Sequence, residues 1–132
     1  MDHVIKLQDG RIEPIQDLMK SKKELALRRI LVDEQMGGAK HLTFGYARFD
    51  SQTSYHKKHV HPNAEEVFYI LTGKGIGGVG EDSQQREMVE GDTVWVPKGA
   101  VHWFYNPFDE PCEMLFVYAA ASLASAGYEV VE

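Results

Sequence analysis

The feature that most constrains the fold is a succession of short apolar runs separated by glycine and proline turns, from Leu42 to Leu123. The runs are rich in aromatic and β-branched residues, which is typical of β-strands. They occupy residues 42–49, 66–73, 91–97, 101–106 and 112–119, and an earlier run occupies 27–32. Turn sequences separate them: GED at 80–82, PKG at 97–99 and NPFDEP at 106–111. Short strands at this spacing predict an all-β sandwich or barrel.

Three further segments are less regular. The stretch GKGIGGVG at 73–80 has too many glycines for a helix and predicts a twisted hairpin with bulges. The stretch PIQDLMKSKKELAL at 14–27 favours a short helix, with Pro14 near its first turn. Residues 122–132 predict a helical turn followed by an extended piece.

Length and composition narrow the class of protein. A chain of 132 residues is about the size of one domain, which we place at 1–132. Acidic residues outnumber basic ones by 20 to 14, which argues against nonspecific nucleic-acid binding. Cys112 is the only cysteine, so an intrachain disulfide is impossible and a reducing compartment fits. The first fourteen residues lack the apolar core of a signal peptide, and no stretch approaches transmembrane length. We therefore expect a cytoplasmic globular protein with no membrane partner.

A histidine cluster stands in HKKHVHPNAEEVFYILTG at 56–73. His59 and His61 are two residues apart, so in a strand both imidazoles share a face. Pro62 then bends the chain, and Glu66 could return beside them from a neighbouring strand. Two imidazoles and a carboxylate favour a first-row transition metal over calcium. An isolated pair of this kind is more often a solvated polar turn, so the metal interpretation depends on a second cluster.

The second cluster is GDTVWVPKGAVHWFYN at 91–106. Pro97 and Gly99 predict a tight turn, in which glycine is free to adopt positive φ. His102 then emerges at the start of the next strand, where it can supply a third imidazole. Asn106 ends that strand before Pro107.

These two stretches resemble the two motifs of the cupin family. The first motif, G-x5-HxH-x3,4-E-x6-G, is matched by His59, His61, Glu66 and Gly73, with Thr53 in place of the leading glycine. The second motif, G-x5-PxG-x2-H-x3-N, is matched at every fixed position from Gly91 to Asn106. The resemblance covers roughly residues 42–118. It implies a jelly-roll β-barrel at about 42–118, with a short helical or irregular N-terminal segment at about 1–26.

The resemblance also implies the metal ligands, which would be His59, His61, Glu66 and His102. Glu65 is the rival carboxylate, because the family allows three or four residues before the glutamate. The expected cofactor is one divalent transition metal, and Fe, Mn, Ni, Co, Cu and Zn all suit such ligands. Four protein ligands leave two positions open in an octahedral ion. Those positions admit water, dioxygen or a chelating substrate.

Strand alternation predicts the lining of the pocket. Phe68 and Ile70 should share the inward face of Glu66, and Phe104 should share that of His102. In an unbroken strand, Tyr55 and Lys57 would also face inward, while His56 and Lys58 would face away. Other aromatic residues are expected to serve packing or an interface: Tyr69, Trp95, Trp103 and Tyr105.

Three functions compete on this evidence. The first is a metal-dependent enzyme acting on a small oxygen-containing molecule, with a dioxygenase as the leading subclass. The second is a non-redox lyase or isomerase. The chain also resembles small cupin lyases that cleave dimethylsulfoniopropionate, although these use a metal-near tyrosine where this chain has Phe68. The third is a non-catalytic small-molecule-binding cupin. Because small cupins usually pair through their outer strands, we expect a homodimer that covers residues 27–32 and Tyr69.

Overall fold

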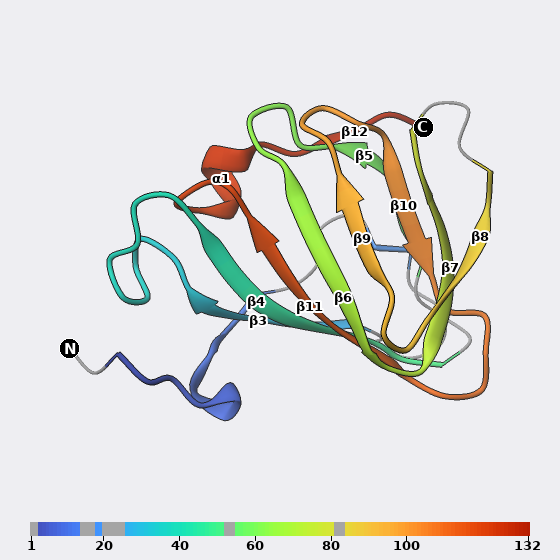
Figure 1. Cartoon of the computed structure of the whole chain (residues 1–132), viewed down its shortest axis with the longest axis horizontal. Helices are drawn as coiled ribbons and strands as arrows, with labels where there is room; N and C mark the ends of the chain where they lie inside the picture. Colours follow the sequence, from blue (N-terminus) through green and yellow to red (C-terminus); the bar gives the residue numbers. More distant parts are fainter. Residues whose placement is uncertain (1–2, 14–17, 20–25, 52–54, 81–83) are drawn as a thin grey trace.

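The computed structural model describes residues 3–13, 18–19, 26–51, 55–80 and 84–132. The described regular structure is almost entirely β-strand (Figure 1). The strands are β1 (Arg11–Ile12), β2 (Leu18–Met19), β3 (Ala26–Val32), β4 (Thr43–Phe49), β5 (Tyr55–Val60), β6 (Glu66–Thr72), β7 (Lys74–Val79), β8 (Arg86–Val89), β9 (Thr93–Val96), β10 (His102–Tyr105), β11 (Cys112–Tyr118) and β12 (Glu129–Val130). Two short helices accompany them, the 3-10 helix η1 (Leu7–Asp9) and α1 (Leu123–Ala126).

The strands form two antiparallel sheets that enclose a common core. One sheet has the order β1-β3-β4-β11-β6-β9, and the other has the order β12-β5-β10-β7-β8, with β2 also paired to β5. The connections cross repeatedly between the two sheets, as a jelly roll requires (Figure 1). The predicted all-β class and jelly-roll barrel are therefore confirmed.

The central strand β11 shows how alternation builds this core. Cys112, Met114, Phe116 and Tyr118 are buried, and the residues between them are half-buried on the other face. The Phe116 ring lies so close to Gly45 of β4 that a Cβ there would be 2.4 Å from it. Glycine is required at this position because no larger residue leaves room for the ring.

The C-terminal segment matches its prediction of a helical turn and an extended piece. Ser122 caps α1, and its side chain accepts a hydrogen bond of 2.9 Å from the Ser125 amide. β12 then pairs with β5, and the two strands lie together at the top of Figure 1. Most of the helix expected within 14–27 lies outside the described ranges. Of the described residues there, Leu18–Met19 form β2 and residues 26–27 begin β3. Among the described residues, no helix has the length and apolar character that a membrane crossing needs.

The prediction for the glycine-rich stretch was wrong. Residues 74–79 form the single strand β7 between β10 and β8, so the stretch is one arm of an antiparallel pair with β8 and not a whole hairpin. Its glycines allow the sheet to pack closely: a Cβ at Gly75 would lie 2.1 Å from the Phe104 ring, and one at Gly77 would lie 2.5 Å from the Trp103 carbonyl oxygen. A glycine inside a strand marks either a bulge or a close approach of other atoms to the backbone, and these glycines serve close packing.

Candidate metal centre

Three buried imidazoles converge where β5 meets β10. His59 of β5 and His102 of β10 are direct partners in the antiparallel ladder, and His61 follows the end of β5. The ring centroids of His59 and His102 are 3.9 Å apart, and each lies about 5 Å from that of His61. One nitrogen from each ring lies within 4.8 Å of the other two. This spacing suits three ligands of one ion.

Backbone carbonyl groups fix the orientation of all three rings. The Nδ1 atoms of His59, His61 and His102 lie 2.5, 2.7 and 3.1 Å from the carbonyl oxygens of Lys57, Gly127 and Ala100. A carbonyl oxygen can only accept, so each neutral imidazole carries its proton on Nδ1 and donates it there. The Nε2 lone pairs are left facing one another. In metal sites, a hydrogen bond from the other ring nitrogen orients each histidine in this way.

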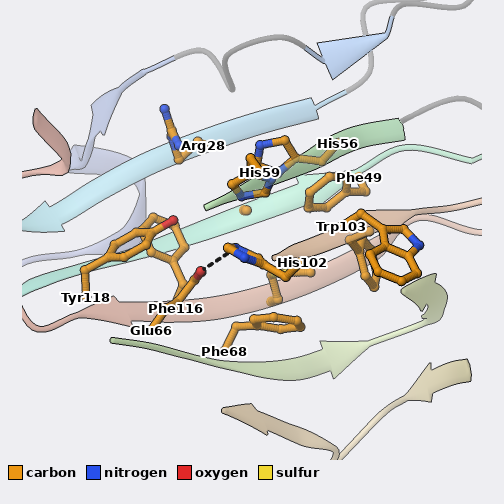
Figure 2. Close-up of a pocket in the computed structure, with 13 residues that line it drawn as sticks. Arg28, Phe49, His56, His59, Glu66, Phe68, His102, Trp103, Phe116 and Tyr118 are labelled. Carbon is orange, nitrogen blue, oxygen red and sulfur yellow. Dashed lines mark ion pairs between the residues drawn. The ribbon is translucent and has the colours of Figure 1, made fainter. Parts of the chain in front are cut away.

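Glu66 adds a carboxylate to the cluster. It begins β6 and is buried, and its Oε1 lies 3.1 Å from His102 Nε2 (Figure 2). The same oxygen lies 3.6 Å from His61 Nε2. Within the described part of the chain, Oε1 of Glu66 and Nε2 of His59 and His61 are buried without a hydrogen-bond partner. Such groups are costly to leave unsatisfied. Three imidazole nitrogens and one carboxylate oxygen fit a divalent first-row metal, which would satisfy all of them.

The protonation states agree with such a site. Burial lowers the pKa of both His59 and His61, so these rings are neutral near pH 7 and can offer lone pairs. Burial acts to raise the pKa of Glu66, but the neighbouring imidazoles of His102 and His61 outweigh it, and the pKa is lowered. Glu66 is therefore ionised, as a metal ligand needs to be.

Glu65 lies away from the cluster. Its side chain is exposed and accepts a hydrogen bond of 3.0 Å from Trp95 Nε1 on the outer face of the sheet. The structure thus brings Glu66, and not Glu65, beside the imidazoles.

A cavity opens beside the cluster and has aromatic walls. Phe68 and Phe104 line it, as strand alternation predicts for both, together with Phe49 and Phe116 (Figure 2). Phe104 contacts Phe49 edge-to-face, with ring centroids 4.9 Å apart. Ile70 is fully buried in the core beyond this wall. Trp103, expected to serve packing or an interface, also lines the cavity.

The opposite wall differs from the expected alternation. His56 lines the cavity and stacks on His59, with ring centroids 4.0 Å apart, whereas the side chain of Lys57 does not reach this wall. The reason is a bulge: His102 pairs with His59 and Phe104 with His56, so β5 has one extra residue there. A bulge reverses the alternation beyond it. Tyr55 lies in β5, but its side chain is outside the described part.

Sequence reasoning missed Arg28, Tyr118 and Tyr128. Arg28 and Tyr118 line the cavity, and the Tyr128 ring lies 5.0 Å from that of His59. Tyr118 is the ladder partner of Glu66 and its hydroxyl approaches that carboxylate, while burial and the charge of Glu66 raise its pKa well above the ordinary value. Alternation could have indicated the first two residues, because Arg28 shares a face with Ile30 and Tyr118 with Phe116.

Comparison with known families decides the classification. Residues 45–118, more than half of the chain, match the family described as Cupin domain. The chain is a cupin. An uncharacterised protein of Methanocaldococcus jannaschii is 34% identical over 65 residues, which are 49% of this cupin and 48% of that protein. This cupin therefore spans only about half of the curated relative that it matches.

Solved structures share the fold at low sequence identity. An oxalate oxidase superposes with a TM-score of 0.71 at 18% identity, over 84% of this cupin and 57% of that chain. The DMSP lyase DddQ from Ruegeria pomeroyi superposes with a TM-score of 0.73 at 20% identity, over 92% of this cupin and 61% of that chain. The two similar folds carry different activities, so the fold alone does not determine the reaction.

Proposed function

We propose that this cupin binds one divalent transition metal through His59, His61, His102 and Glu66. The observation that carries the proposal is the set of buried Nε2 and Oε1 atoms that face one another without hydrogen-bond partners among the described residues. The ligand set does not choose among Fe, Mn, Ni, Co, Cu and Zn. When bound, such an ion would act as a Lewis acid with positions open to oxygen ligands.

We further propose that the protein is an enzyme acting on a small oxygen-containing molecule, and that the reaction is a dioxygenation. The aromatic cavity beside the cluster supports this, because its walls can pack against an apolar substrate. Phe68, Phe104 and Phe116 would position the substrate. The fold shared with an oxalate oxidase agrees with an oxidative reaction.

A non-redox lyase or isomerase is the second candidate, and Tyr118 favours it. The sequence offered no tyrosine at position 68, but the fold brings the Tyr118 hydroxyl to the Glu66 carboxylate from β11. A protonated phenol beside the cluster could donate a proton to a substrate oxygen. The fold shared with a DMSP lyase is in keeping with this alternative.

Oxygen uptake by the iron-loaded protein separates the two candidates. Substrate probes with two oxygen donors, such as β-diketones, α-hydroxy ketones and catechols, are added one at a time in air. A dioxygenase consumes oxygen only when a probe is present, and Tyr118→Phe retains that uptake. A probe that changes the metal's spectrum without oxygen uptake, and is converted by wild type but not by Tyr118→Phe, supports the lyase or isomerase instead.

We also propose that the protein is a cytoplasmic homodimer. The outer face of the sheet that contains β6 and β9 carries large exposed apolar side chains: Tyr69 is 41% exposed and Trp95 is 59% exposed. Pairing of two copies through this face would cover them. The cytoplasmic location accords with the single cysteine, Cys112, which is buried.

A further inference from the structure

His56 is a polar residue of the cavity wall that the proposed ligand set does not use. Its ring borders the cavity and stacks on His59, with ring centroids 4.0 Å apart and an angle of 22° between the ring planes (Figure 2). Both side chains come from β5, where the bulge opposite β10 turns His56 inward. His56 is therefore held beside a proposed metal ligand.

The Nε2 atom of His56 lacks a partner. Within the described part of the chain, this nitrogen is buried and makes no hydrogen bond. A buried polar atom without a partner destabilises the fold, so its presence in a native protein indicates a role of its own. Phenylalanine at this position would also stack on His59 and would bury no unsatisfied nitrogen. The imidazole therefore points to a partner that arrives with a ligand.

The proposed metal ion is not that partner. The metal cluster among the described residues consists of His59, His61 and His102, whose ligand atoms lie within 4.8 Å of one another. His56 lies outside this cluster. Arg28 borders the same cavity, but it already has an interaction partner. Nε2 of His56 is thus a free polar group of the wall, and a ligand in the cavity is the partner that remains.

The chemistry of the nitrogen favours a hydroxyl group. In a neutral imidazole, one nitrogen donates a hydrogen bond and the other accepts one, depending on the tautomer. A hydroxyl group can both donate and accept, so it pairs with His56 Nε2 in either tautomer. A carbonyl or ether oxygen only accepts, so it pairs with one tautomer alone.

The size and the other walls of the cavity limit the rest of the ligand. The space open to the centres of water molecules is about 50 Å³. By that measure one water needs about 10–15 Å³, so the cavity has room for a ligand equivalent to only a few waters. Phe104 is the ladder partner of His56, so their side chains share a face, and Met114 and Phe116 extend the apolar wall. The cavity therefore suits a short molecule with a hydroxyl group and an apolar end.

We propose that His56 Nε2 binds the hydroxyl group of a small hydroxycarbonyl substrate, whose carbon chain packs against Phe104 and Phe116. The carbonyl oxygen of this substrate would occupy an open position of the metal, and this part of the inference rests on the proposed function. His56 determines specificity, because it distinguishes a hydroxylated substrate from an apolar molecule of the same shape. It does not hold the metal.

The test compares hydroxyacetone with 2-butanone, in which a methyl group replaces the hydroxyl group. Binding is measured by calorimetry on zinc-loaded and on chelator-treated protein. Since a hydrogen bond between uncharged groups contributes modestly to affinity, the preference for hydroxyacetone should be about 3- to 10-fold larger in wild type than in His56→Phe. His56→Gln, whose amide can hydrogen-bond, should recover part of that preference. His41→Phe is the control, since His41 is exposed and does not line the cavity, and it should behave as wild type.

The outcomes separate the role of His56 from the metal proposal, because metal content is measured on the same samples. An equal preference in wild type and folded His56→Phe overturns the inference, and so does a wild type that binds neither compound. Loss of zinc from folded His56→Phe also overturns it, since His56 would then serve the metal. If His56→Phe fails to fold, His56→Leu replaces it with the same expected loss of preference. A native protein that holds no metal, but loses its preference for hydroxyacetone in His56→Phe, refutes the proposed metal function and leaves the His56 assignment standing.

Discussion

Gly127 joins the C-terminal segment to the metal centre, and replacing it by alanine should weaken metal binding. Its backbone has φ 80° and ψ 159°, a combination that glycine alone adopts readily. Its carbonyl oxygen accepts the hydrogen bond from His61 Nδ1 at 2.7 Å. The added Cβ would also lie 2.8 Å from Cγ and 2.9 Å from Cδ of Pro62, which is too close for either atom to stay in place.

The magnitude follows from these two effects. Backbone strain of this kind costs roughly 1–3 kcal/mol of folding stability. Relief of the contact with Pro62 moves the Gly127 carbonyl away from His61, and loss of such a partner typically lowers metal affinity by about 10- to 100-fold. Gly127→Ala should therefore bind the metal about 10- to 100-fold more weakly than wild type.

The assay is metal affinity by competition with a chromogenic chelator, with thermal unfolding measured on the same samples. Gly38→Ala is the control, since Gly38 has φ +76° but no atom within 4 Å of the added Cβ. It should lose stability through backbone strain and keep its metal affinity. A folded Gly127→Ala protein with unchanged metal affinity would refute the role assigned to this carbonyl.

Two further predictions concern acid stability and assembly. Burial holds the pKa values of His56 and His59 below the ordinary value, so below about pH 6.5 the unfolded chain binds more protons than the folded one, and stability falls as the pH falls. Between pH 6 and pH 5, the free energy of unfolding of the metal-free protein, measured with urea, should fall by about 1.2 kcal/mol for each of these histidines. An unfolding free energy that does not change with pH would contradict their burial as neutral groups. Sedimentation at micromolar concentration should show a dimer that Tyr69→Glu weakens and that Val89→Glu, in the other sheet, does not. A wild-type monomer would refute the proposed pairing.

Much of the fold was predictable because its signals are local. Strand runs end at glycine and proline turns, and the turn at Pro97 and Gly99 has the expected positive φ at Gly99. Asn106 also closes its strand as expected, donating to the Phe49 and Glu110 carbonyl oxygens and accepting from the Phe108 amide. Apart from the bond to Phe49, these features depend on residues within a few positions of one another, so a single sequence displays them.

The parts that sequence reasoning missed depend on contacts between distant strands. The bulge in β5 that turns His56 inward is defined by its pairing with β10, about 45 positions further along the chain. Tyr118 meets Glu66 only because β11 and β6 are ladder neighbours. Gly127 supports His61 from the last segment of the chain. None of these partners lies near the other in sequence, so strand alternation alone could not reveal them.

Metal content of purified protein tests the central claim most directly. Elemental analysis is carried out on wild type, His61→Ala, Glu66→Ala and Glu65→Ala, each with its fold confirmed by circular dichroism. Because Glu66 Oε1 faces the imidazoles and Glu65 bonds Trp95 outside the barrel, Glu65→Ala should keep close to one divalent ion per chain. His61→Ala and Glu66→Ala should lose most of it. Equal metal content in all four proteins, or a greater loss in Glu65→Ala than in Glu66→Ala, would contradict the proposed ligand set.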